Sequence, residues 1–172
     1  MRVGLIGTGY AAKLRAQTLL NDERAELVAV VGGNTVSKTA AFANDFQCEV
    51  FSSPQQLIEQ KDIELVIVSN VNSEHGTVAR AALEADKNVV IEYPMSLDVV
   101  EASELIKLAK SKNKLLHVEH IELLGGLHQA LKQHLDKIGE VFYVRYSTIK
   151  PEHPAPRKWT YNHNLFGFPL MG

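Results

Sequence analysis

The sequence predicts an α/β protein: a Rossmann-type doubly wound parallel sheet, followed by the truncated start of an α+β antiparallel-sheet domain. Six short apolar runs alternate with amphipathic stretches, which is the rhythm of a parallel sheet with helical connections. One run, at residues 65–68, is continuously apolar, as expected of a strand buried on both faces. A glycine-rich turn directly after the first run is the third observation. The strand-like runs are residues 3–6, 27–31, 49–51, 65–68, 89–91 and 115–118.

Two of the intervening stretches have the helical spacing that such a sheet requires. Apolar residues at 78, 81, 82 and 85 follow the i, i+3, i+4, i+7 pattern, with Ser73 placed to cap the start. The spacing returns at 102, 105, 106 and 109 behind Asp98, in a start that resembles a capping box. We expect both stripes to face the sheet.

The pattern changes after the sixth run, so we expect a dinucleotide-binding domain over residues 1–118 and the incomplete beginning of a substrate domain over 119–172. Residues 117–133 read mostly as helix. Residues 140–149 are rich in β-branched and aromatic residues and read as a strand. Self-association through the exposed edge of that strand is one option. Four prolines within residues 151–169 indicate a long ordered loop or lid.

Composition excludes several classes of protein. In 172 residues, 45% are hydrophobic and 22% charged, which is typical of a globular protein. The net charge of −2 offers no broad basic field for nucleic acid. The single cysteine, Cys48, cannot form an internal disulfide, and no ligand spacing indicates a metal site. No apolar run approaches the ~20 residues of a membrane helix, and no leader follows Met1, so we expect a cytoplasmic protein.

The turn after the first strand matches G-x-G-x-x-A. Gly7 permits the tight turn, Gly9 lets the backbone approach a pyrophosphate, and Ala12 allows the helix to pack closely on the sheet. The N-terminus of the helix then faces the negative charge of the ligand. We therefore predict that a dinucleotide is bound by Gly7, Thr8, Gly9, Tyr10, Ala11 and Ala12.

The second strand should end near the adenosine ribose, where NAD-preferring sites often carry an acidic residue. No Asp or Glu occurs between residues 27 and 44, and the turn at 32–38 offers small donors and one cation. This favours NADP (NADPH) over NAD, although NAD stays possible, and an ordinary turn with a solvated lysine is the alternative. The candidate residues for the 2′-phosphate are Asn34, Thr35, Ser37 and Lys38.

Further cofactor contacts are expected at the ends of the fourth and fifth strands, which face the ligand crevice of such sheets. A histidine in the first turn of a helix is, however, as often a local structural residue. The candidates are Ser69, Asn70, Asn72, His75, Glu92 and Tyr93.

These motifs resemble the Gfo/Idh/MocA oxidoreductases, whose pattern includes G-x-G-x-x-A, N-x-x-H after the fourth strand and E-K-P after the fifth. Here Asn72 and His75 match the second motif, but Tyr93 replaces the lysine of the third. The family uses that lysine as a proton shuttle to a substrate hydroxyl. A phenol is a poor base for alcohol oxidation at neutral pH, so a different substrate is implied.

Within the family, the residues at 92–94, 115–124, 138–142 and 159–170 are similar to the biliverdin reductases, especially the cyanobacterial branch. That resemblance implies reduction of biliverdin to bilirubin, by hydride transfer from NADPH to the central methine bridge while a proton reaches a pyrrole nitrogen. It also implies that relatives continue well beyond residue 172 and that their proton-donating arginine lies there. We therefore expect a fragment with little turnover.

The resemblance places four catalytic candidates near one crevice: Tyr93, Glu119, His120 and Glu122. Tyr93 would contact nicotinamide or substrate, with packing against Pro94 as the alternative. A neutral histidine or a protonated glutamate can donate or relay a proton, and a salt-bridged helix start is the other reading of residues 119–122.

Cations and aromatic residues of the proline-rich segment are the candidates for binding the substrate, as ion pairs to propionates or stacked on bilin rings. The alternative is an ordinary surface loop. These residues are Lys150, Arg157, Lys158, Trp159 and Tyr161. Two other functions stay open: a sugar or cyclitol dehydrogenase of the same family, and a non-catalytic NADP-binding regulatory protein.

Overall fold

The computed structural model describes residues 1–33, 35–147 and 162–167. The chain divides into two compact units, which are treated separately here. The first contains residues 1–119 and the described part of 159–172, and the second contains residues 120–158. The boundary between 119 and 120 lies close to the expected one, but the described residues 162–167 belong to the first unit.

A parallel sheet of six strands forms the centre of the first unit, in the order β3-β2-β1-β4-β5-β6. The chain leaves β1 in one direction to build β2 and β3, and returns to its other side to build β4, β5 and β6. This confirms the predicted doubly wound sheet. The strands are β1 (Arg2–Ile6), β2 (Glu26–Val31), β3 (Glu49–Val50), β4 (Leu65–Val68), β5 (Asn88–Glu92) and β6 (Leu116–Glu119).

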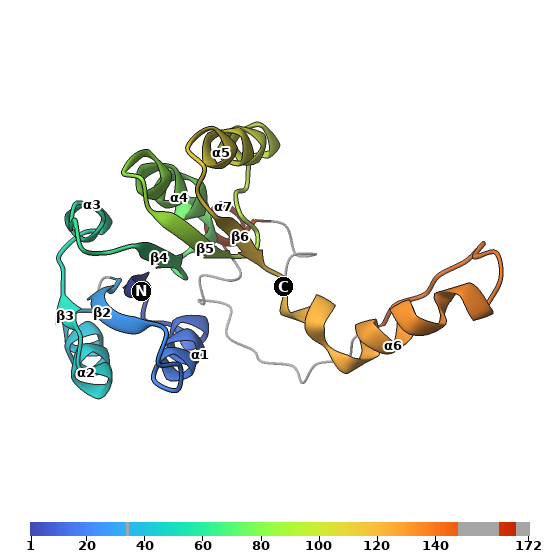
Figure 1. Cartoon of the computed structure of the whole chain (residues 1–172), viewed down its shortest axis with the longest axis horizontal. Helices are drawn as coiled ribbons and strands as arrows, with labels where there is room; N and C mark the ends of the chain where they lie inside the picture. Colours follow the sequence, from blue (N-terminus) through green and yellow to red (C-terminus); the bar gives the residue numbers. More distant parts are fainter. Residues whose placement is uncertain (34, 148–161, 168–172) are drawn as a thin grey trace. The chain divides into compact units, whose positions relative to one another are not determined.

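Helices cover both faces of this sheet (Figure 1). α1 (Tyr10–Leu19) and α2 (Val36–Phe46) pack on one face around the buried Leu5 and Val30. α3 (Pro54–Ile58), α4 (His75–Glu84) and α5 (Val99–Ser111) pack on the other face, where Leu83 and Leu105 are fully buried. Each such side chain stabilises the fold by about 1.5–3 kcal/mol through burial.

Of the two helix caps predicted from the sequence, the cap at Asp98 is present in the structure and the cap at Ser73 is not. Asp98 caps α5, because its Oδ1 accepts from the backbone N–H groups of Val100 at 2.7 Å and Glu101 at 3.0 Å. The predicted cap at Ser73 is wrong. That residue lies inside a 3₁₀ turn, η1 (Asn72–Glu74), and α4 begins only at His75 without a side-chain cap. The turn bends the chain before the helix starts, so the serine is no longer at the helix boundary.

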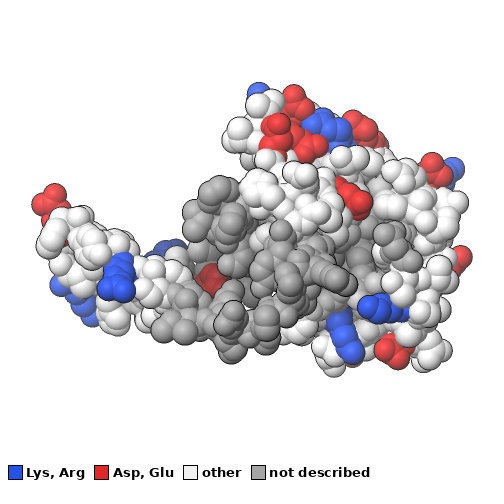
Figure 2. All heavy atoms as spheres, turned by 180° about the vertical axis from the view of Figure 1, so that it is seen from behind, with Lys and Arg blue, Asp and Glu red and all other residues white. Residues whose placement is uncertain are grey.

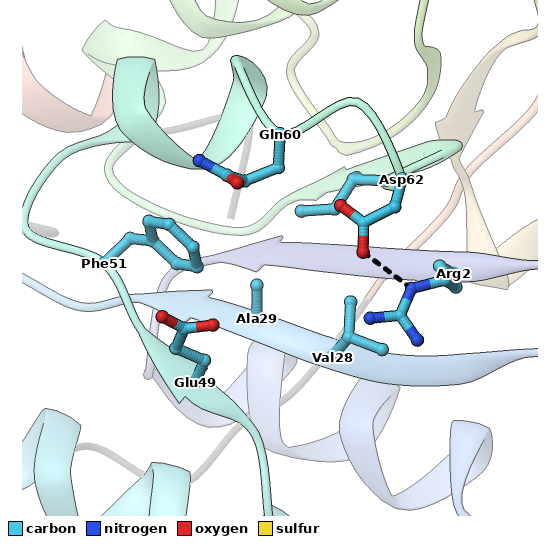
Figure 3. Close-up of a pocket in the computed structure, with 8 residues that line it drawn as sticks. Arg2, Val28, Ala29, Glu49, Phe51, Gln60 and Asp62 are labelled. Carbon is cyan, nitrogen blue, oxygen red and sulfur yellow. Dashed lines mark hydrogen bonds and ion pairs between the residues drawn. The ribbon is translucent and has the colours of Figure 1, made fainter.

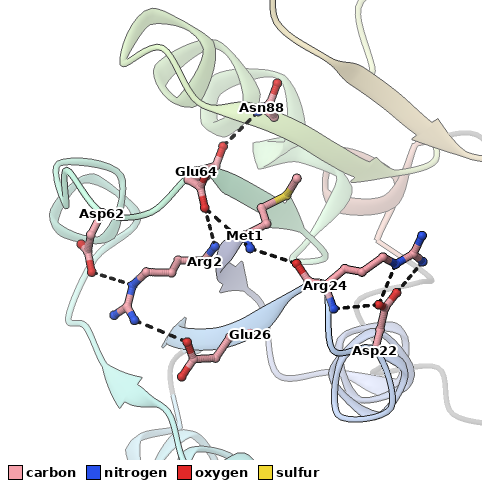
Figure 4. A network of polar contacts seen from close by, with 8 residues as sticks. All are labelled: Met1, Arg2, Asp22, Arg24, Glu26, Asp62, Glu64 and Asn88. Atoms are coloured by element: carbon pink, nitrogen blue, oxygen red, sulfur yellow. Dashed lines mark hydrogen bonds and ion pairs between the residues drawn. The ribbon is translucent and has the colours of Figure 1, made fainter.

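Charged side chains tie the amino edge of the sheet together (Figure 4). Arg2 Nε donates to Asp62 Oδ2 at 2.9 Å, and its guanidinium lies 3.4 Å from Glu26. The backbone N–H of Arg2 donates to Glu64 Oε2 at 2.8 Å. A cavity of about 70 Å³ lies beside Arg2 and Asp62 (Figure 3), with room for a few waters at ~30 Å³ each. These ion pairs are exposed, so each contributes about 1 kcal/mol or less. The edge lies opposite the carboxyl ends of the strands.

Lys87 is a buried cation near the amino end of β5. Its Nζ donates to the carbonyl oxygens of Gln60 at 2.6 Å and Ile63 at 2.7 Å. Burial lowers the pKa of this lysine. The two bonds hold the turn that leads into β4, so Lys87 has a structural role.

The second unit contains short helices: η2 (Ile121–Leu124), α6 (Gly126–His134) and η3 (Leu135–Lys137). The predicted helix over 117–133 is therefore only partly correct, because residues 117–119 belong to β6. Pairing with β5 gives these residues a backbone partner that a local pattern does not reveal. The helix itself starts at Gly126.

The predicted strand at 140–149 is wrong over its described part, residues 140–147, which have no regular structure. Phe142 is 98% exposed, and Tyr143, Val144 and Tyr146 are exposed as well. A strand needs a neighbouring strand to pair its backbone groups, and β propensity alone does not supply one. Self-association through this strand accordingly has no support in the structure.

Among the described residues, none of the helices has the length and apolar character needed to cross a bilayer. Basic and acidic side chains are interspersed over the described surface drawn in Figure 2. On that face the mixture agrees with the near-neutral net charge of the sequence.

Candidate functional site

A pocket of about 440 Å³ opens at the carboxyl ends of β1, β2 and β4. The chain reverses its direction of winding between β1 and β4, and ligands of open α/β sheets bind at that point. The volume falls within the usual range for ligand sites, roughly 300–1,000 Å³. The lining residues are Ile6, Gly7, Thr8, Gly9, Val31, Gly32, Gly33, Ser52, Ser53, Pro54, Ser69, Asn70, Val71 and Glu74.

Gly7 joins the ends of three strands. Its φ is +123°, and its N–H donates to the carbonyl oxygen of Val31 at 2.8 Å. A Cβ added at this position would lie 2.3 Å from the carbonyl oxygen of Ser69. Only glycine fits this conformation and this close approach. The first glycine of the motif is therefore required by the fold itself.

Gly9 differs from Gly7, because a Cβ added there would meet no atom within 4 Å. Gly9 is the N-cap of α1, with a φ of −79° that any residue can adopt. Its absence of a side chain keeps open the space in front of the helix N-terminus, where a pyrophosphate would bind. Of the other motif residues, Thr8 lines the pocket, Tyr10 is 82% exposed, Ala11 is half-buried, and Ala12 is fully buried on the side of α1 that packs on the sheet.

The predicted 2′-phosphate residues lie where β2 passes into α2. Gly32 and Gly33 line the pocket, and Thr35, Ser37 and Lys38 are exposed at the start of α2. Asn34 lies outside the described residues. The side chains of this turn are accessible, so a phosphate at the α2 N-terminus fits the geometry.

The end of β4 supplies polar atoms that fit a sugar. Ser69 is 9% exposed, and within the described part of the chain its Oγ has no hydrogen-bond partner. The same holds for Oδ1 of Asn70, whose Nδ2 donates to Glu74 at 2.7 Å. Buried polar groups normally have partners, and ribose hydroxyls are suitable ones. Contacts of Ser69 and Asn70 with a cofactor ribose stay a prediction.

Asn72 has a different partner from the one predicted. Its side chain is buried, and Nδ2 donates to the carbonyl oxygen of Phe166 at 2.8 Å. That residue ends α7 (His163–Phe166), so Asn72 holds a segment of distant sequence against η1. The role of Asn72 as a ribose ligand stays a prediction that this geometry does not favour.

His75 is fully buried. Its Nδ1 lies 2.7 Å from the carbonyl oxygen of Pro94, and its Nε2 lies 3.3 Å from that of Asn70. Burial lowers the pKa of His75, although its two backbone contacts oppose the shift. His75 therefore connects the loops after β4 and β5, which is the structural alternative to direct cofactor binding.

Three charged side chains, Arg15, Glu92 and Glu119, gather with His117 on one face of β5 and β6. Arg15, from α1, donates through Nε to Glu92 Oε1 at 2.9 Å, and its Nη2 lies 3.5 Å from Glu119 Oε1. His117 Nε2 lies 3.3 Å from Glu119 Oε2. Arg15 was not predicted as a site residue, because nothing in the helix pattern shows which strands its side chain will reach.

The catalytic candidates do not all fall in one unit. Tyr93 follows β5, is 39% exposed and precedes a cis peptide bond to Pro94. Glu119 ends β6 in the first unit, whereas His120 and Glu122 are exposed in the second unit. The substrate-binding candidates Lys150, Arg157, Lys158, Trp159 and Tyr161 lie outside the described residues. Each of these roles stays a prediction.

Two serines of the pocket were missed by the sequence analysis. Ser52 and Ser53 follow β3, and Ser53 Oγ accepts from the backbone N–H of Gln56 at 3.3 Å to cap α3. The sequence Ser-Ser-Pro is a helix-start signal, so this end of the pocket was detectable. No group of three or more potential metal ligands occurs in residues 1–33, 35–147 and 162–167.

Comparison with known proteins agrees with this site. The family model described as "Oxidoreductase family, NAD-binding Rossmann fold" (GFO_IDH_MocA) matches residues 1–120. The crystal structure of biliverdin reductase in complex with biliverdin and NADP+ from Synechocystis sp. PCC 6803 is similar, with 53% identity and a TM-score of 0.93. The match covers 99% of this chain and 54% of that one.

Curated relatives match a smaller share of this chain, and with lower identity, than the Synechocystis structure does. Biliverdin reductase A of Homo sapiens is 32% identical over 122 residues, which are 71% of this chain and 40% of that protein. The oxidoreductase YdgJ of Escherichia coli (strain K12) is 35% identical over 157 residues, 88% of this chain and 44% of that protein. The chain thus spans about half the length of the relatives it matches. The family-model match and the Rossmann architecture together establish that the chain belongs to the Gfo/Idh/MocA oxidoreductase family.

Proposed function

We propose that this chain is the NADPH-binding part of an enzyme that reduces biliverdin to bilirubin. The observation that carries the proposal is the likeness to the Synechocystis biliverdin reductase, at 53% identity along 99% of the chain. Tyr93, in place of the family's lysine, supports it from the residues themselves. Reduction of a conjugated methine bridge needs no base to take a proton from an alcohol.

The pocket at the carboxyl edge fits the proposed cofactor. The turn at Gly7 and Gly9, with the N-terminus of α1, would hold the pyrophosphate. Ser69 Oγ and Asn70 Oδ1 would bond ribose hydroxyls and so gain the partners that they lack among the described residues. NADPH supplies the hydride when it is bound. Ile6, Val31 and Val71 would contribute apolar contacts to the bound cofactor.

Lys38 is proposed to bind the 2′-phosphate that distinguishes NADPH from NADH. Replacing it in Lys38→Glu should raise the Kd for NADPH by about 10- to 100-fold, because a charge-assisted hydrogen bond worth roughly 1.5–3 kcal/mol is lost. The Kd for NADH should change little. Titration calorimetry with both cofactors measures the ratio, and Lys107→Glu, on the exposed side of α5, is the matched control. Tighter binding of NADH than NADPH by the unchanged chain would contradict the NADP assignment.

A paired assay tests the reaction. The chain, and a version extended to the length of its relatives, are mixed with biliverdin and NADPH, and loss of biliverdin absorbance is followed beside growth of the bilirubin band. Turnover by the longer form alone is the expected result, because the chain spans only about half of its relatives.

Two other outcomes identify the alternatives. A longer form that binds NADPH and oxidises a sugar or cyclitol, but leaves biliverdin unchanged, is a dehydrogenase of the wider family. A longer form that binds NADPH and turns over neither substrate class is a regulatory protein. Turnover by the 172-residue chain alone would show that its own residues supply the proton.

A further inference from the structure

We propose that Arg15 is a positioning residue for the nicotinamide half of the cofactor site. It holds the carboxyl ends of β5 and β6 together and thereby fixes the loop that carries Tyr93. This inference rests on the proposed cofactor. Glu92 and Glu119 are the carboxylates through which Arg15 would hold the two strand ends.

The register of the sheet creates the need for a cation. Glu92 and Glu119 are direct partners in the pairing of β5 with β6. Like charges directly opposite each other on neighbouring strands are destabilising. Both carboxylates point to the face covered by α1, since Arg15 reaches both of them, at 2.9 Å and 3.5 Å. One guanidinium therefore compensates two adjacent carboxylates.

Burial makes this cluster more than a surface ion pair. The side chains of Arg15, Glu92 and Glu119 are 23%, 16% and 15% exposed. Exposed pairs contribute little, whereas a charge left without its partner in a partly buried site is costly. His117, which is 53% exposed, contacts the outer oxygen of Glu119 and does not reach Glu92 among the contacts described. Arg15 is thus the residue that joins the two strands.

The position of the cluster relates it to one half of the cofactor. The pyrophosphate turn lies after β1, and the 2′-phosphate is read at the end of β2. Because β4, β5 and β6 follow on the other side of β1, the nicotinamide half extends toward them. Tyr93 directly follows Glu92 in the chain, so a displaced end of β5 also moves Tyr93. The adenosine half, beside β2 and α2, is held by other residues.

Glu119 is the second partner of Arg15 in this proposal. Its Oε1 lies 3.5 Å from Arg15 Nη2, and its Oε2 lies 3.3 Å from His117 Nε2. In this arrangement Glu119 orients Arg15 and the end of β6.

Two ligands distinguish effects on the two halves of the cofactor site. NADPH occupies both halves, whereas 2′,5′-ADP carries only the adenosine half with its 2′-phosphate. In Arg15→Met the Kd for NADPH should rise about fivefold or more, roughly 1 kcal/mol, while that for 2′,5′-ADP changes less than about twofold. Titration calorimetry on the 172-residue chain measures both. Arg80→Met is the matched control, because it removes an ion pair to Glu104 on α5, away from the crevice.

Two further variants distinguish positioning from general support of the fold. Arg15→Lys keeps the charge with a single ammonium and should restore part of the NADPH affinity. Adding Glu119→Gln to Arg15→Met removes one of the opposed charges and should also restore affinity. If Arg15→Met does not fold, Arg15→Lys and the double variant carry the same comparison.

The inference is overturned if Arg15→Met leaves both Kd values unchanged, or weakens both ligands equally. It is also overturned if neither rescue variant differs from Arg15→Met in NADPH binding. Failure of the unchanged chain to bind NADPH would instead overturn the proposed cofactor, and this inference with it.

Discussion

Replacement of Gly7 by alanine is expected to destabilise the chain by about 2–6 kcal/mol and to abolish NADPH binding. The backbone at φ +123° strains a residue with a side chain by about 1–3 kcal/mol. The new Cβ would also lie 2.3 Å from the carbonyl oxygen of Ser69, an overpacking that costs a further ~1–3 kcal/mol. Urea unfolding followed by circular dichroism measures the stability.

Gly9→Ala is the matched control for this prediction. Its Cβ would meet no atom within 4 Å, so the stability of the chain should change by less than about 1 kcal/mol. NADPH affinity should nevertheless fall about tenfold, because the methyl group enters the space of the pyrophosphate. Retained affinity in Gly9→Ala would show that the pyrophosphate does not lie over this turn. Retained stability in Gly7→Ala would show that the strand ends can move apart.

The second large effect is expected at His75. His75→Ala removes a fully buried ring. A neutral imidazole donates through only one ring nitrogen, so one of the two carbonyl oxygens in contact with it, that of Pro94 at 2.7 Å or that of Asn70 at 3.3 Å, loses its donor. A cavity and an unsatisfied acceptor together should cost about 2–4 kcal/mol. Because both loops border the cofactor crevice, NADPH affinity should fall as well. Loss of stability below ~1 kcal/mol would show that the loops hold without the histidine.

His75 also gives a pH dependence with a defined sign. Burial lowers the pKa of His75 below its ordinary value of 6.5, against the opposing effects of its backbone contacts and the charges of Glu92 and Glu74. The unfolded chain therefore takes up a proton at a higher pH than the folded chain. Stability from this group is present above pH 6.5 and is lost as the pH falls through the folded pKa.

The measurement is the free energy of unfolding between pH 7.5 and about pH 5, compared between the chain and His75→Gln. The variant should show the shallower fall over this window. His134→Gln, on exposed α6, should behave like the unchanged chain. Parallel curves for the chain and His75→Gln would contradict the role of buried, neutral His75.

The six strands could be predicted to within one residue at each end. The central strand β4 is the clearest case, because a strand buried on both faces is a continuous apolar run. The start of α5 could be predicted for a similar reason, since the Asp98 cap bonds only to its own next residues. The segment at 140–147 shows the limit of such reasoning. Its residues favour a strand, but no described strand pairs with them, and they stay irregular.

The features of the candidate site also fall into two groups, those that depend on neighbouring residues and those that join distant parts of the chain. The turn at Gly7 and Gly9 could be predicted from the residues alone, because tight-turn geometry and an open helix N-terminus depend on neighbouring residues. The contacts of Arg15 with Glu92 and Glu119, and of Asn72 with the carbonyl of Phe166, could be recognised only in the folded chain. Those contacts join residues far apart in the chain, and they arise from strand order and register, which local propensities do not specify.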